Sequence, residues 1–225
     1  MSEIKHHLTD ALLMGYSAGT LPEGFNLVVA AHISMCDECR ARMYEFDNLG
    51  GEIVESAPAQ PLSEMSLNAT LNMIDAGDLI EKTSSTSMSL SPAISKAQSN
   101  IFPIALQDYV GGDLSAVRWR KVGGGVQQAI LKTDSSASVR LLRIPAGTAV
   151  PDHGHRGTEL TLVLQGAFRD ETDHFKRGDI EVANEDLDHQ PVAEDGEDCI
   201  CLAATDAPLR FNSWIPRIAQ PFLRI

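Results

Sequence analysis

The feature that most constrains the fold of this chain is a change of hydrophobic period across a segment rich in Ser and Thr. Residues 82–100, KTSSTSMSLSPAISKAQSN, show little sustained apolar periodicity, which is typical of a linker. Apolar residues recur at helical spacing before this segment and alternate in short runs after it. The sequence therefore predicts a two-domain α+β chain: a small helical domain over residues 1–82, a linker over 83–102 and an antiparallel β domain over 103–225.

Four short helices are expected in the first domain. Apolar residues recur every four positions from Leu8 to Tyr16, and Gly19 follows as a stop signal. Residues 21–33 carry helix-start features before an apolar run, and residues 36–51 form an apolar face that ends in paired glycines. A last stripe consists of Leu67, Leu71 and Ile74.

Short strands are expected in the second domain. Four segments are rich in Val, Ile, Leu and Thr and are broken by Gly, Pro or Asp, as in an antiparallel barrel or sandwich. These segments cover residues 139–147, 159–168, 179–183 and 197–205.

The charge of the chain bears on its partners and its location. A formal net charge of −13 disfavours direct binding to the phosphate backbone of nucleic acid. Residues 1–82 hold four Lys and Arg against thirteen Asp and Glu, which serves either solubility or the attraction of a basic partner. No apolar run approaches the roughly 20 residues of a membrane span, and the N-terminus lacks the apolar core of a signal peptide. We therefore expect a cytoplasmic protein that does not enter a membrane.

A candidate zinc site lies near the N-terminus, where two of the four cysteines of the chain stand three residues apart. His32, Cys36 and Cys39 occupy positions i, i+4 and i+7, either on one helical stripe or with the cysteines wrapping a helix start. Zinc prefers four thiolate or imidazole ligands. We expect His7 as the fourth ligand, because it directly precedes the first apolar stripe whereas His6 would point elsewhere. The alternative is a pair of small buried cysteines beside an unrelated histidine.

A second candidate metal site lies in the β domain. The stretch from Gly147 to Gly166 places His153, His155 and Glu159 in the pattern G-x₅-H-x-H-x₃-E-x₆-G. On a strand the two histidines share a face, and the carboxylate joins them after a turn. Such ligands suit zinc, iron, manganese or copper. The alternative is a β domain without metal, whose histidines only form hydrogen bonds.

Both motifs resemble known families. His7 and the element AHISMCDECR resemble the zinc-binding anti-sigma domain of bacteria. The second stretch resembles the first motif of the cupin superfamily, and the second cupin motif adds His189, eleven residues after Gly178. Around it, Asn184, Asp186 and Ala193 stand where the family usually has Pro, Gly and Asn.

The two domains together resemble the ChrR group of anti-sigma factors. This resemblance implies a helical zinc domain that binds a group IV (extracytoplasmic function, ECF) sigma factor and blocks its access to core RNA polymerase. It also implies a cupin domain that senses singlet oxygen or organic hydroperoxide, and a protein that is not an enzyme. Two alternatives stay open on the residues alone, a metal-dependent cupin oxygenase and a cupin regulator that binds a small ligand.

The remaining two cysteines, Cys199 and Cys201, stand two apart on a predicted strand and so face one way. The simpler interpretation is packing within the β domain. The alternative is a redox-sensitive pair.

Overall fold

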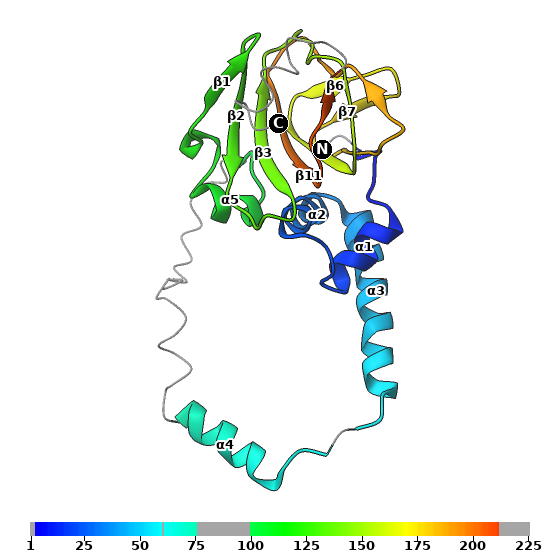
Figure 1. Cartoon of the computed structure of the whole chain (residues 1–225), viewed down its shortest axis with the longest axis vertical. Coiled ribbons are helices and arrows are strands. Elements are labelled where there is room, and N and C mark those ends of the chain that lie inside the picture. Colours follow the sequence, from blue (N-terminus) through cyan, green and yellow to red (C-terminus); the bar gives the residue numbers. More distant parts are fainter. Residues whose placement is uncertain (1–2, 60, 76–99, 212–225) are drawn as a thin grey trace. The chain divides into compact units, whose positions relative to one another are not determined.

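The computed structural model describes residues 3–59, 61–75 and 100–211 (Figure 1). Contacts divide the chain into two compact units, one of residues 1–50 with 99–225 and the other of residues 51–98. Most of the predicted linker falls in residues 76–99, outside the described residues. The predicted domain boundaries at residues 82 and 102 therefore stay predictions.

The four helices predicted in the first part of the chain are present, but the third continues to Ser56, past the paired glycines at which it was predicted to end. Local signals set the starts of the first two. Thr9 caps the first helix by accepting a hydrogen bond from the Leu12 backbone N–H. Pro22 precedes the second helix, where its missing N–H costs no hydrogen bond. These helices are α1 Asp10–Ser17, α2 Glu23–Met35, α3 Asp37–Ser56 and α4 Glu64–Asp75. Two short helices follow later, α5 Ile104–Val110 and the 3₁₀ helix η1 Leu114–Ala116.

The β domain consists of antiparallel sheets, as the alternating patterns predict. A six-stranded sheet has the order β1-β2-β3-β11-β5-β8, and two three-stranded sheets have the orders β10-β6-β7 and β12-β4-β9. The strands are β1 Arg120–Gly123, β2 Val126–Leu131, β3 Ser138–Ile144, β4 His153–Gly154, β5 Glu159–Gln165, β6 Ala167–Arg169, β7 His174–Lys176, β8 Ile180–Ala183, β9 Asp188–His189, β10 Val192–Ala193, β11 Cys199–Thr205 and β12 Arg210–Phe211. The four predicted strand segments correspond to β3, β5 with β6, β8 and β11.

The helices α1, α2 and α5 and the first half of α3 share one hydrophobic core with the β domain, which the sequence did not predict. The helix α2 packs against β11, β5 and α5, and Figure 1 shows it at the ends of the strands of the large sheet. Val28 and Val29 on α2 are fully buried, as are Leu162 and Leu202 on the sheet. Burial of apolar surface on this scale stabilises both parts together.

Gly24 marks the closest approach of α2 to the sheet. A Cβ atom built at Gly24 would lie 2.5 Å from Cγ2 of Val139 on β3, so only glycine fits there without a shift.

A separate group of apolar residues fills the space between the sheets, including Ile144, Val163 and Phe168. None of the described helices is both long and apolar enough to cross a membrane.

Candidate metal centres

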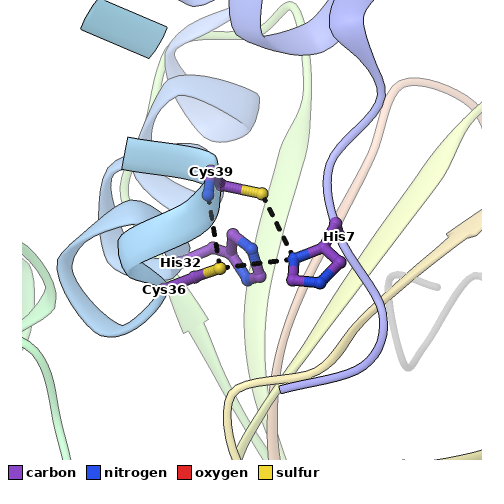
Figure 2. A group of neighbouring side chains, drawn as sticks. All are labelled: His7, His32, Cys36 and Cys39. Atoms are coloured by element: carbon purple, nitrogen blue, oxygen red, sulfur yellow. Dashed lines mark hydrogen bonds between the residues drawn. The ribbon is translucent and has the colours of Figure 1, made fainter. Parts of the chain in front are cut away.

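The first candidate site brings together the four residues predicted from the sequence. We call it the Cys/His site, and its members are His7, His32, Cys36 and Cys39 (Figure 2). His32 lies in the last turn of α2 and Cys39 in the first turn of α3. Cys36 lies between them with an extended backbone, φ −110° and ψ 107°. The two cysteines therefore wrap a helix start rather than continue one helical stripe.

The geometry of this site suits a tetrahedral metal. The Cys36 Sγ and Cys39 Sγ atoms lie 3.3 Å and 3.6 Å from Nδ1 of His7, as the dashed lines of Figure 2 mark. All four ligand atoms lie within 4.8 Å of one another. Ligands at zinc's usual bond lengths would be roughly 3.3–3.8 Å apart. The structure brings His7 into this group, while His6 instead contacts Asp173.

A bound cation would stabilise the buried ligand atoms of this site. Neither ring nitrogen of His32 has a hydrogen-bond partner of standard geometry among the described residues. Burial lowers the pKa of His32 to about 4, although the nearby Gly178 backbone opposes this, so the ring is neutral and keeps a lone pair. Burial also raises the pKa of Cys39 to about 11. A bound divalent cation would stabilise the thiolates, so the donor set fits a metal.

Glu38 is a member of this environment that the sequence analysis missed. Its Oε2 atom lies 3.3 Å from Nε2 of His7, on the side of the ring opposite the thiols. A carboxylate in this position orients a metal-bound histidine. The sequence feature that could have identified Glu38 is its position between Cys36 and Cys39.

The second candidate site gathers three of the four residues predicted in the β domain. We call it the triple-histidine site, and its members are His153, His155 and His189. Strand pairing of β4 with β9 sets His153 directly opposite His189, and Nε2 of His155 lies 3.3 Å from Nε2 of His189. All three residues are buried. The carbonyl oxygen of Pro151 lies 2.9 Å from Nδ1 of His153, which makes Nε2 of that ring its candidate metal-binding atom.

Glu159 lies beside the three histidines but not within their group. Its Oε2 atom is 3.9 Å from Nδ1 of His155, and its Oε1 atom accepts a hydrogen bond from Thr161. Burial lowers the pKa of both His153 and His155, and the negative charge of Glu159 opposes this effect. The role of Glu159 as a metal ligand therefore stays a prediction.

Two carboxylates that the sequence analysis missed orient His189. Its Nδ1 atom lies 2.8 Å from Asp170 and 3.2 Å from Glu181. Burial lowers the pKa of His189, but these two carboxylates outweigh it and raise the pKa to about 9. They accept a hydrogen bond from Nδ1–H, so that Nε2, which faces Nε2 of His155, is the atom that a metal ion would bind after displacing its proton. Asp170 and Glu181 stand 19 and eight residues before His189 in the sequence and form no motif with it.

A cavity of about 350 Å³ reaches the triple-histidine site. Its wall is mainly apolar, with charged groups confined to a few positions such as Arg140 and Glu159. Among the apolar lining residues are Leu142, Ile144, Val150 and Phe168. Such a cavity would accept a small molecule beside a metal ion.

Cys199 and Cys201 face the same side of β11, as predicted. Both are buried, and their Sγ atoms are 3.5 Å apart. The neighbouring Cys199 sulfur and burial raise the pKa of Cys201 well above its usual value, so its thiol stays protonated. Both side chains belong to the apolar group between the sheets, and Cys201 also lines the cavity beside the triple-histidine site.

The profile of the ChrR cupin-like domain family matches residues 107–208. Over 222 residues the chain is 57% identical to the anti-sigma-E factor ChrR of Cereibacter sphaeroides, with 99% of both chains covered. The chain belongs to the ChrR family of anti-sigma factors. The crystal structure of Rhodobacter sphaeroides SigE in complex with the anti-sigma ChrR matches it with a TM-score of 0.74 and 54% identity, covering 91% of this chain and 100% of the other.

Membership of the ChrR family confirms two predictions from the sequence. The β domain is cupin-like, and the chain belongs with transcription regulators rather than with enzymes. The oxygenase alternative is therefore set aside. Both candidate metal centres lie within the length shared with the ChrR relative.

Proposed function

We propose that this chain binds and inhibits a sigma factor of the ECF class (group IV) and thereby keeps it from core RNA polymerase. The observation that carries the proposal is 57% identity to an anti-sigma factor along 99% of both chains. Identity over nearly the whole length covers the helices and the β domain alike, not one shared module. Because RNA polymerase works in the cytoplasm, we place the protein there.

Exposed apolar side chains supply a surface for the sigma factor. On α4 the predicted stripe is open to solvent, with Leu67 66% and Leu71 47% exposed. On the last turns of α3, Ile53 and Val54 are 62% and 74% exposed. A helix that exposes a stripe of large apolar residues normally covers it with a partner. The excess of acidic residues over residues 1–82 would attract a basic surface.

The Cys/His site is proposed to hold zinc. Two thiolates and two imidazoles complete a tetrahedron, the closed arrangement of a structural zinc site. When bound, the zinc would stabilise the junction of α2, α3 and the N-terminal segment by joining residues from all three. The triple-histidine site is proposed to hold zinc or another divalent metal, with Glu159 as a further ligand.

The β domain is proposed to be the sensor that releases the sigma factor under oxidative stress, by singlet oxygen or organic hydroperoxide. Two observations support this division of roles. The four candidate ligands of the Cys/His site would form a closed tetrahedron, whereas a metal bound by nitrogen and oxygen ligands at the triple-histidine site can expand its coordination and accept an oxygen ligand. In addition, the 350 Å³ cavity gives a small molecule access to His153 and His189.

The proposal is tested by changing the apolar face of α4 in the full chain. Replacing Leu71 with Asp places a charge in the predicted contact, and we expect Kd for the cognate sigma factor to rise by at least about tenfold. Asn72→Asp is the matched control, because it adds the same charge to the same helix about 100° away, and we expect less than about a twofold change. Binding is measured by isothermal titration of the purified proteins.

Two outcomes would count against the proposal. Unchanged binding by Leu71→Asp would remove α4 from the contact surface. Failure of the unmodified chain to bind any ECF sigma factor of its own organism would overturn the anti-sigma function itself.

A further inference from the structure

The N-terminal segment before α1 is attached to the β domain immediately before it supplies a ligand to the Cys/His site. The Asp179 Oδ1 atom accepts hydrogen bonds from the backbone N–H groups of Lys5 and His6, at 2.7 Å and 3.0 Å. The carbonyl oxygen of His6 in turn accepts a hydrogen bond from the N–H of Ile180. Both backbone groups of His6 are therefore held by the β domain, one residue before His7.

Asp179 is built into the β domain as a rigid anchor. Its carboxylate is buried, with 2% of its side chain exposed, and Oδ2 accepts a third hydrogen bond from the N–H of Lys176. Its backbone carbonyl accepts a hydrogen bond from the N–H of Val163 on β5. A buried carboxylate with three donors of this kind fixes the chain segments that it joins.

The residue before Asp179 contacts the same site from another side. Gly178 has φ +93°, and a Cβ atom there would lie 2.6 Å from Cδ1 of Ile4, so the N-terminal segment packs on a position that requires glycine. The His32 ring also lies against the Gly178 backbone. Both imidazoles of the Cys/His site are thus positioned by one turn of the β domain.

The same short segment reaches the other metal centre. Glu181, two residues after Asp179, lies 3.2 Å from Nδ1 of His189. Residues 178–181 therefore contact the surroundings of both centres within a single strand start. A strand start has little freedom to absorb a shift at one end without moving the other.

From these contacts we propose that Asp179 is a positioning residue of the Cys/His site and that residues 178–181 couple the two metal centres. This rests on the proposed occupancy of both centres by metal. Loss of the ion held by His189 frees Glu181, shifts the start of β8 and loosens the hold of Asp179 on the His6 backbone. His7 is then less firmly held against the two thiolates, and the metal there exchanges faster. The regulation of sigma binding would thus pass from the β domain to the helices through this segment.

The test uses Co²⁺ in the full chain, because thiolate-to-cobalt absorption reports the Cys/His site alone. The triple-histidine site has no thiolate. The rate at which this band disappears in excess EDTA is measured for each variant. We expect Asp179→Ala to increase the rate about tenfold or more, as for other residues that position metal ligands. The rate for Asp179→Asn should lie between those of the unmodified chain and Asp179→Ala, because its amide oxygen still accepts hydrogen bonds from the backbone N–H groups of Lys5 and His6.

Asp113→Ala is the matched control. The Asp113 carboxylate also accepts hydrogen bonds from three backbone N–H groups, those of Ile101, Phe102 and Leu114, but it contacts neither centre. We expect the rate of cobalt loss from Asp113→Ala to stay within about twofold of that from the unmodified chain. Coupling is measured with His189→Ala, which should accelerate cobalt loss at least about threefold in the unmodified chain and add nothing in Asp179→Ala.

The outcomes separate the parts of the proposal. A folded Asp179→Ala or Asp179→Asn chain with an unchanged rate refutes the positioning role. Effects of Asp179→Ala and His189→Ala that simply multiply refute the coupling. An unmodified chain without a thiolate band refutes the Cys/His site as a metal centre, and the positioning role with it.

Discussion

Replacing Gly24 with Ala decides whether the helices pack on the β domain in solution. The Cβ atom would lie 2.5 Å from Cγ2 of Val139 and 3.2 Å from Cβ of Ala137. Val139 is only 1% exposed, and its branched side chain has little rotamer freedom with which to move away. Crowding of this kind costs about 1–3 kcal/mol, whereas the gain in helix propensity from Gly to Ala is at most about 1 kcal/mol.

For a crowding cost of about 2 kcal/mol, the middle of that range, the balance is a net destabilisation of about 1–2 kcal/mol, which for a chain of this length lowers Tm by about 2–8 °C. Unfolding is followed by far-UV circular dichroism and by calorimetry on the full chain. Gly50→Ala is the matched control: this glycine also lies in a helix, but its Cβ would meet nothing within 4 Å. We expect Gly50→Ala to leave Tm unchanged or to raise it.

A rise in Tm for Gly24→Ala, like that allowed for Gly50→Ala, would refute the reasoning. It would mean that α2 is not packed on β3 and that the helices fold independently of the β domain. The far-UV circular dichroism signal of both variants before heating should match that of the unmodified chain, which checks that the helix itself forms.

Metal analysis of the full chain should find two ions, and Cys36→Ser should lose one of them, because the triple-histidine site contains no cysteine. Cys199→Ser is the control and should keep both; loss of both ions in Cys36→Ser would contradict the prediction that the triple-histidine site binds an ion of its own. In a reporter strain driven by the sigma factor, Glu159→Ala should repress normally without stress but fail to respond to hydroperoxide. Normal induction in that strain would remove Glu159 from the sensor and leave Cys199 and Cys201 as the next residues to change.

Local patterns in the sequence predicted the elements and most of the candidate metal ligands. His32, Cys36 and Cys39 lie within eight residues, so the helix end and the following helix start bring them together without help from distant residues. His153 and His155 are likewise close neighbours in the chain. The change from helical to alternating periodicity predicted both the helices and the antiparallel strands, because each element must bury its own apolar face.

Only the tertiary structure decided which residues support those ligands. Asp170, Glu181 and Asp179 carry no local motif, and they reach His189 or the His6 backbone only through the pairing of strands and the course of the N-terminal segment. The sequence likewise did not predict the packing of α2 on the sheet. The Ser- and Thr-rich segment indicated separate domains. The apolar residues of a helix show that one face is buried, but they do not show which surface packs against it. Contacts between distant segments depend on shape complementarity in the folded chain, and for this reason periodicity and spacing alone could not predict them.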